Sequence, residues 1–286
     1  MRSRRLARAL PLWVVPAAAW LLSLAAGTSA VPAPVRRVVS MNPSLTETLL
    51  ALGARELLVG VDDFSARLLP SVAELPRVGG LFNPSLEAVL ALEPDLVVLV
   101  PSAEQRALRE QLESLGVPVL AAANLSLEEL LASIEQVGAR IGRQREAAAR
   151  VAALRAALVP APDTAPRERA VLVLQRDPLF IAGRGSFLDA LLRAAGVENL
   201  GAGLADPYPR VGLEWLLAAE PDAILDASED PEPAARYWAR WPSLPAVARG
   251  RVIPVAASEV TMPGPHLDRA LAVLRRALAR PEAAAQ

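Results

Sequence analysis

One ten-residue pattern occurs twice in the chain, and it constrains the fold more than any other feature. Residues 86–95 read LEAVLALEPD, and residues 213–222 read LEWLLAAEPD, at an offset of 127 positions throughout. In each copy a short helical stretch is stopped by Pro, and an Asp and an apolar, strand-like run follow. An internal repeat of this kind predicts two related α/β lobes. A cleft between two lobes is a preferred place for a ligand.

Short apolar runs alternate with helical patterns on both sides of the middle of the chain. This alternation predicts parallel sheets covered by helices. Ser44 with Glu47, and Ser126 with Glu129, have the spacing of capping boxes at helix starts. We expect strands at residues 35–40, 57–61, 96–100, 117–121, 170–174, 223–226 and 252–255.

A mostly helical stretch lies between the two α/β regions. Residues 143–158 place Ala147, Val151, Leu154 and Leu158 on one helical face, and the proline-rich residues 159–166 follow. We therefore place the connection between the lobes here. The predicted organisation is an N-terminal lobe at 31–140, a connecting helix at 141–160 and a C-terminal lobe at 161–286.

The N-terminus has the pattern of a targeting segment. Arginines occupy positions 2, 4, 5 and 8, an apolar run covers residues 10–26, and Thr28-Ser29-Ala30 supplies small residues before a cleavage point. The pattern predicts a signal peptide at residues 1–30 and a soluble periplasmic protein after cleavage. We also expect the mature chain to be monomeric. A membrane-anchoring helix is the alternative, but the run is short for one that crosses a bilayer.

Charge and cysteine content exclude several classes of protein. Of the 30 basic residues, four lie in the first 30 positions, which leaves 26 against 31 acidic residues in the rest of the chain. A mildly acidic body does not predict nucleic-acid binding. The chain has no Cys, so disulfides, thiolate chemistry and a lipoprotein anchor are excluded.

The only histidine, His266, limits the chemistry further. A zinc or manganese receptor needs several His and carboxylate ligands at suitable spacing, which this chain lacks. The motifs G-x-S-x-G, G-x-G-x-x-G and the P-loop are absent as well. We therefore expect a binding protein rather than an enzyme. An enzyme built around His266 and a scaffold that binds only partner proteins are the alternatives from other classes.

Several motifs resemble the periplasmic binding proteins of cobalamin and siderophore ABC importers. They are residues 40–47, 79–87, 93–97, 207–214 and 264–266, and the resemblance covers residues 35–279. The family implies two Rossmann-like lobes with central parallel sheets, bridged by one long backbone helix. It also implies a soluble receptor that captures a ligand and delivers it to a permease dimer in the inner membrane.

The resemblance assigns a role to two acidic residues at repeat-related positions. Glu87 and Glu214 match the surface glutamates, one in each lobe, that dock onto arginines of the permease. Both also fall in the first turn of a helix, where a carboxylate is favoured by about 0.3–1 kcal/mol. The two roles are compatible.

The resemblance also implies a ligand site formed by loops of both lobes. Aromatic side chains there offer flat apolar surface to a macrocycle. Core packing is the alternative for Phe64 and Phe180. His266 either coordinates a metal in the ligand or lies at the start of the last helix. The expected ligand-binding residues are Ser44, Phe64, Phe180, Tyr208, Glu259, Met262 and His266.

The expected ligand is cobalamin or a related corrinoid. Haem and ferric siderophores are the alternatives within the same family. A siderophore is less favoured, because His266 stands where many siderophore receptors have an Arg that pairs with an anionic ligand. We expect no catalytic cofactor and no metal held by the protein itself.

Overall fold

The computed structural model describes residues 34–160, 162 and 167–279. These residues belong to one compact unit, Pro34–Gln286. The expected signal peptide and its cleavage point lie outside the described residues. Within the described part, no helix has both the length and the apolar character needed to cross a bilayer.

The first sheet is fully parallel and has the order β2-β1-β3-β4. Its central strands, β1 and β3, are short runs of apolar or small residues that are buried throughout, which is typical of a sheet covered on both faces. The strands are β1 (Val38–Ser40), β2 (Leu58–Val61), β3 (Leu96–Leu99) and β4 (Val119–Ala121), and the helices are α1 (Pro43–Ala51), α2 (Asp63–Leu68), α3 (Leu86–Ala91) and α4 (Arg106–Ser114), with one-turn helices at Arg55–Leu57 and Pro70–Val72.

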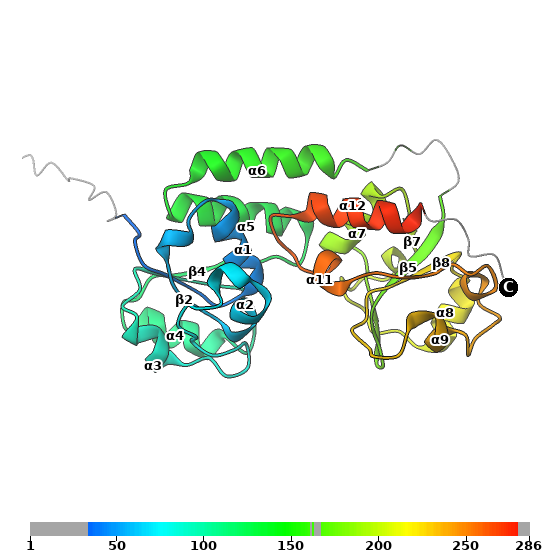
Figure 1. The fold of residues 1–286 in the computed structure, drawn as a ribbon, viewed down its shortest axis with the longest axis horizontal. Helices are drawn as coiled ribbons and strands as arrows, with labels where there is room; N and C mark the ends of the chain where they lie inside the picture. Colours follow the sequence, from blue (N-terminus) through cyan, green and yellow to red (C-terminus); the bar gives the residue numbers. More distant parts are fainter. Residues whose placement is uncertain (1–33, 161, 163–166, 280–286) are drawn as a thin grey trace, which may run out of the picture. The chain divides into compact units, whose positions relative to one another are not determined.

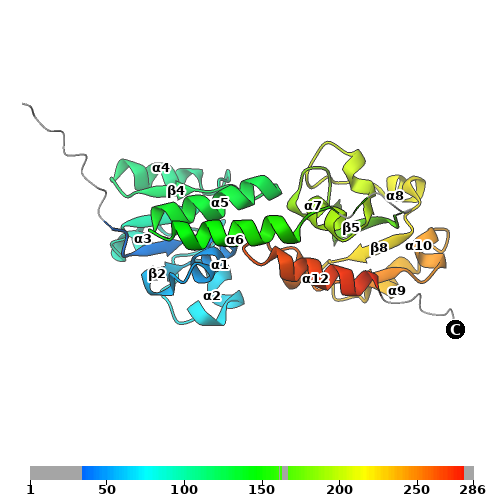
Figure 2. The same cartoon turned by 90° about the horizontal axis from the view of Figure 1, so that it is seen from above.

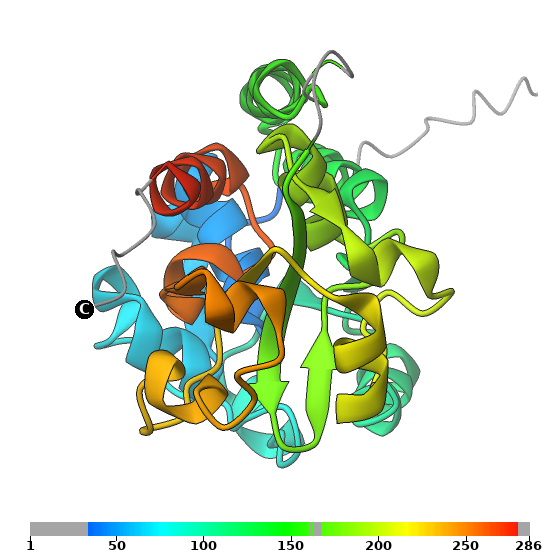
Figure 3. The ribbon, with the colours of Figure 1, turned by 90° about the vertical axis from the view of Figure 1, so that its right-hand side faces the viewer.

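The second sheet has the order β6-β5-β8-β9, and β7 pairs with β5 outside this path. All pairs are parallel except β5 with β6, which form a hairpin around Asp177 and Pro178. Figure 3 shows this hairpin, in light green, between helices of the same lobe. The strands are β5 (Arg169–Arg176), β6 (Leu179–Ile181), β7 (Glu198–Asn199), β8 (Ala223–Asp226) and β9 (Val252–Pro254), and the helices are α7 (Phe187–Ala194), α8 (Leu213–Ala219), α9 (Ala234–Trp238), α10 (Pro245–Ala248), α11 (Ala257–Val260) and α12 (Leu267–Leu278), with a 3-10 turn at Leu200–Gly203.

Two antiparallel helices, α5 (Leu127–Arg140) and α6 (Gln144–Ala157), connect the sheets (Figures 1 and 2). The capping box of Ser126 and Glu129 at the start of α5 is confirmed. Gly138 allows the two helices to approach closely, because a Cβ there would lie 2.4 Å from the Cβ of Ala147. Helix α6 lies within the range 141–160 expected for the connecting helix.

The connecting helices share a core with both sheets. One continuous cluster of buried apolar side chains extends from the first sheet through α5 and α6 to the second sheet and α12. An ion pair adds a polar link, since Arg150 of α6 donates to the carboxylate of Asp268 of α12 through both terminal guanidinium nitrogens, Nη1 and Nη2. Members of the cluster from successive elements are Val38, Leu96, Leu130, Ile134, Leu154, Leu172, Leu225 and Leu271.

The sequence repeat is also a structural repeat. Helix α3 leads into β3, and helix α8 leads into β8, in each case through a turn after the helix. Glu93 and Glu220 occupy equivalent positions in these turns, with φ of 43° and 47°. Residues other than glycine rarely adopt this left-handed conformation unless surrounding contacts hold it.

Those contacts are equivalent in the two copies. Arg37 donates to the carbonyl of Leu92 at 3.0 Å, and Arg169 donates to the carbonyl of Ala219 at 2.9 Å. Asp95 and Asp222 accept hydrogen bonds from the backbone N–H groups of the same two arginines. Each repeat therefore joins the end of its helix to the neighbouring strand.

One predicted helix start is wrong. Asn42, not Ser44, caps α1, and its side chain accepts a hydrogen bond from the backbone N–H of Ser44. Pro43 occupies the first helical position, where its missing N–H costs nothing. The helix therefore begins before Ser44, and the expected capping box with Glu47 does not form.

Candidate functional site

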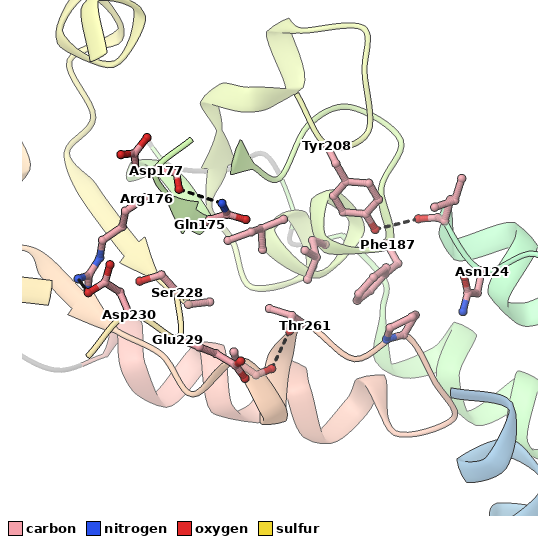
Figure 4. Close-up of a pocket in the computed structure, with 16 residues that line it drawn as sticks. Asn124, Gln175, Arg176, Asp177, Phe187, Tyr208, Ser228, Glu229, Asp230 and Thr261 are labelled. Atoms are coloured by element: carbon pink, nitrogen blue, oxygen red, sulfur yellow. Dashed lines mark hydrogen bonds and ion pairs between the residues drawn. The ribbon is translucent and has the colours of Figure 1, made fainter. Parts of the chain in front are cut away.

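An open cavity of about 630 Å³ lies at the carboxyl ends of β5 and β8. Ligands of parallel α/β sheets bind at this edge, because the loops that leave the strands there can diverge and form a crevice. Figure 4 shows Tyr208 and Phe187 on one side of the cavity and Ser228, Glu229 and Asp230 on the other. The lining residues are Asn124, Leu125, Leu174, Gln175, Arg176, Asp177, Phe187, Leu188, Tyr208, Ala227, Ser228, Glu229, Asp230, Ala257, Thr261 and Pro263.

The segment before α5 forms one end of the cavity. The carbonyl of Leu125 accepts hydrogen bonds from the backbone N–H of Phe187 at 2.9 Å and from the hydroxyl of Tyr208 at 3.4 Å. The amide of Asn124 donates to the hydroxyl of Ser44 at 2.8 Å. These bonds connect α1, the start of the connecting helices and the C-terminal lobe at the edge of the cavity.

Tyr208 presents a protonated phenol to the cavity. Burial raises the pKa of its hydroxyl well above the ordinary value, and the negative charge of Glu129 raises it further. The hydroxyl is therefore neutral at neutral pH, and its proton is donated to the carbonyl of Leu125. An aromatic ring with a polar tip can pack on a flat ligand and orient it through one hydrogen bond.

The opposite wall carries most of the charge. Three carboxylates, those of Asp177, Glu229 and Asp230, line the cavity together with one guanidinium, that of Arg176. The side chain of Arg176 is only 3% exposed, and its Nε atom lies 3.0 Å from the Oδ2 atom of Asp226. The wall is therefore mainly acidic, and its only cation among the described lining residues is held by a buried partner.

Three of the expected ligand-binding residues lie in or beside the cavity. Tyr208 lines it. Ser44 is buried and reaches it through its hydrogen bond with Asn124. Met262 is half-buried between Thr261 and Pro263, which both line the cavity.

The other four expected residues lie outside this lining. Phe64 is 40% exposed on α2, with the guanidinium of Arg67 stacked 4.5 Å from its ring centroid. Phe180 is half-buried in the edge strand β6, and Glu259 is exposed on α11. Their roles in binding stay predictions.

His266, the fourth, is half-buried at the start of α12, and its side chain makes no capping hydrogen bond. Burial lowers the pKa of its imidazole, and the positive charges of Arg269 and Arg150 lower it further. The imidazole is therefore neutral at neutral pH. No group of three or more His, Asp or Glu side chains in the described part of the chain is arranged to hold a metal ion.

The chain matches the periplasmic binding protein family over residues 38–257. It belongs to this family. A vitamin B12-binding protein of Vibrio parahaemolyticus is 28% identical over 243 residues, which cover 83% of this chain and 87% of the relative. The predicted family and the two-lobed α/β fold are thereby confirmed.

Solved structures of the same fold include receptors for two different macrocycles. A periplasmic heme binding protein of Pseudomonas aeruginosa has a TM-score of 0.70 and 28% identity, covering 87% of this chain and 95% of that one. The periplasmic vitamin B12 binding protein of Vibrio cholerae has a TM-score of 0.69 and 25% identity, covering 86% and 97%. Membership of the family therefore identifies the chain as a binding protein, but it does not by itself identify the ligand.

In this periplasmic binding protein the two repeat-related glutamates are available at the surface. Glu87 and Glu214 are both exposed, in the first turns of α3 and α8. Ser85 caps α3 with its side chain, whereas α8 begins after Gly212, which offers no side-chain cap. Neither glutamate lines the cavity.

Sequence reasoning missed much of the polar wall of this periplasmic binding protein. Arg176 ends β5 and Asp177 follows it, and Ser228, Glu229 and Asp230 come after the end of β8. Polar residues directly after a buried strand are the signal that was available, since such positions lie at the ligand-binding edge of a parallel sheet. Asn124 and Leu125 carry no comparable signal, because a long-range contact brings them to the cavity.

Proposed function

We propose that this chain is the substrate-binding protein of an ABC importer, and that it captures cobalamin or a related corrinoid in the periplasm. The names of its sequence relatives support the corrinoid, and the family supports the transport role. After export the protein acts as a soluble monomer that carries its ligand to a permease dimer. The ranges 31–140, 141–160 and 161–286 are our proposed boundaries for the two lobes and the connecting helix.

The chemistry of the cavity is the observation that carries the choice of ligand. Its lining offers aromatic surface, a phenol oxygen and several carboxylate and carbonyl acceptors, without a metal-binding cluster among the described residues. Such a site suits a ligand whose metal is already coordinated by a macrocycle with hydrogen-bonding groups at its edge. The primary amides around a corrin ring are groups of this kind, because each donates two hydrogen bonds.

Haem is the second candidate, and the Pseudomonas aeruginosa structure favours it. Haem receptors need an axial ligand for iron, for which His and tyrosinate are both suited. In this chain the Tyr208 hydroxyl is directed to the carbonyl of Leu125, to which it donates a hydrogen bond at 3.4 Å. His266 does not line the cavity. These two features support the corrinoid over haem.

The protein acts by binding alone in this proposal, without catalysis. The permease is met through Glu87 and Glu214, which lie at equivalent places on the two lobes and can pair with basic groups on a two-fold symmetric partner. Ligand and permease therefore use separate surfaces of the receptor.

The experiment that tests the proposal is a titration of the purified mature protein, monitored by visible absorption. Cyanocobalamin, haemin and a ferric siderophore are added in parallel and removed by gel filtration. We expect the red corrinoid to remain with the protein and the other two to separate from it. Retention of haemin with a Soret shift, and no retention of cyanocobalamin, would support the second candidate instead.

A further inference from the structure

Arg176 is the one guanidinium among the described lining residues, and it is directed into the protein rather than into the cavity. Its Nε atom donates to Asp226 Oδ2 at 3.0 Å, and its Nη1 atom donates to the carbonyl of Glu232. Its guanidinium also stacks 4.8 Å from the ring centroid of Tyr237. Figure 4 shows the side chain beside Asp230, whose carboxylate lies 3.5 Å from Nη1.

Asp226 is the centre of this arrangement. Its Oδ2 atom accepts hydrogen bonds from Arg176 and, at 2.6 Å, from the indole N–H of Trp238. Its Oδ1 atom accepts from the hydroxyl of Ser228 at 2.6 Å and from the backbone N–H of Ser228 at 3.1 Å. The Asp226 side chain is 1% exposed, so these donors take the place of water.

This network decides the electrostatic sign of the cavity wall. Removing one partner from a buried ion pair leaves an uncompensated charge, so the pair resists opening to serve a ligand. With Arg176 neutralised by Asp226 and Asp230, the exposed carboxylates of Asp177 and Glu229 dominate the wall. Carboxylates accept hydrogen bonds from neutral donors and repel anions.

We propose that Asp226 is a specificity-determining residue of this receptor. By holding Arg176 away from the cavity, it makes the site select ligands that present neutral hydrogen-bond donors, such as primary amides, against ligands that present carboxylates. Asp226 acts through Arg176 and does not touch the ligand. The inference rests on the proposed function, since it assumes that this cavity is the ligand site.

The test compares two ligands of the same shape. Cyanocobalamin and its monocarboxylic acids differ only in one peripheral group, an amide in the first and a carboxylate in the others. For the wild-type protein we expect the dissociation constant of at least one of the acids to exceed that of cyanocobalamin by about tenfold, a factor within the range of a single charge contact. Equal binding of all the acids and cyanocobalamin would overturn the inference.

The variant Asp226→Asn keeps the shape of the side chain and an acceptor for Trp238, but it removes the buried one of the two carboxylate charges that balance Arg176. We expect it to bind the discriminated acid at least as well as cyanocobalamin, because Arg176 can then attract the added carboxylate. The double variant Arg176→Gln/Asp226→Asn should lose this gain. Unchanged discrimination in a folded Asp226→Asn protein would show that the pair is only structural.

Asp222→Asn is the matched control. It removes the same charge at the opposite end of β8, where Asp222 pairs with Arg249 outside the cavity. It should discriminate between the ligands like the wild type. Loss of discrimination in Asp222→Asn would overturn the inference, because the preference would then depend on the overall charge of the protein and not on Asp226. If Asp226→Asn does not fold, as judged by circular dichroism, the wild-type comparison of amide and acid still decides.

Failure of the proposed function has a different signature. If cyanocobalamin does not bind at all, the corrinoid assignment is wrong whatever Asp226 does. Haemin and its dimethyl ester then provide the same contrast between carboxylate and neutral group. Preference of the wild type for the ester, reduced in Asp226→Asn, would support the role of Asp226, and preference for haemin itself would refute it.

Discussion

The docking role of the paired glutamates can be tested by removing both carboxylates. Glu87 and Glu214 are exposed in the first turns of α3 and α8, where each contributes about 0.3–1 kcal/mol to its helix. The double change to Ala should therefore reduce the free energy of unfolding by at most about 2 kcal/mol. A typical free energy of unfolding is about 5–15 kcal/mol, so most of it remains and the receptor stays folded.

The expected effect on the permease is larger. Truncating one partner of a desolvated charge pair costs about 2–5 kcal/mol, whereas a rim charge costs much less. Each single variant should then weaken binding to the permease by about tenfold or more, and the double variant should nearly abolish transport. Charge reversal to Arg should be worse than Ala, because it adds repulsion to the lost attraction. Reciprocal reversal on the permease should restore part of the loss.

The assay pairs ligand titration of the isolated receptor with transport in reconstituted vesicles. Ligand affinity should change by less than about twofold, or 0.4 kcal/mol, because neither glutamate lines the cavity. Glu110→Ala and Glu198→Ala provide a matched control, since they remove one exposed carboxylate from each lobe. Normal transport by the Glu87/Glu214 double variant would refute docking and leave only the helix-start role.

Three further predictions concern the ion pair between Arg150 of α6 and Asp268 of α12, the close approach of Gly138 to Ala147, and export. Burial alone would raise the pKa of Asp268, but its hydrogen bond and charge contact with Arg150 lower the pKa overall. Asp268→Asn should therefore lower the Tm at pH 7, and the difference from the wild type should vanish as the pH falls through this depressed pKa. A Tm difference that stays unchanged in acid would contradict this prediction. Gly138→Ala should lower the free energy of unfolding in urea by about 1–3 kcal/mol, because the added Cβ would overlap Ala147. Adding Ala147→Gly should recover part of the lost free energy, and no recovery would rule out the overlap. N-terminal sequencing of the periplasmic fraction should find a chain that begins near residue 31, and an uncleaved, membrane-bound chain would contradict export.

The parallel core of both lobes was predictable because its signals are local. Runs such as residues 96–100 and 223–225 are continuously apolar, as is typical of strands buried on both faces. The repeat then related β3 to β8, and the turns after α3 and α8 proved equivalent down to the left-handed Glu93 and Glu220. The predicted start of α1 was wrong because two neighbouring residues could each cap the helix. Asn42 caps it instead of Ser44, since Pro43 already occupies the first helical position.

The polar wall of the cavity was less predictable for a different reason. Arg176 and Asp226 are 50 positions apart, and only the parallel pairing of β5 with β8 brings their side chains together. Sequence periodicity shows that both strands are buried, but it does not give their register. Tyr208 could be anticipated from its flanking prolines in a polar loop, whereas the contribution of Leu125 depends on how α5 meets the second lobe.

Calorimetric titration of the mature protein with cyanocobalamin tests the proposed ligand directly. We predict saturable binding of one corrinoid to each protein molecule, weakened by about tenfold or more in Tyr208→Ala and unaffected by Glu198→Ala, which lies outside the cavity. If a folded protein does not bind cyanocobalamin but binds haemin saturably, its ligand is haem and not a corrinoid.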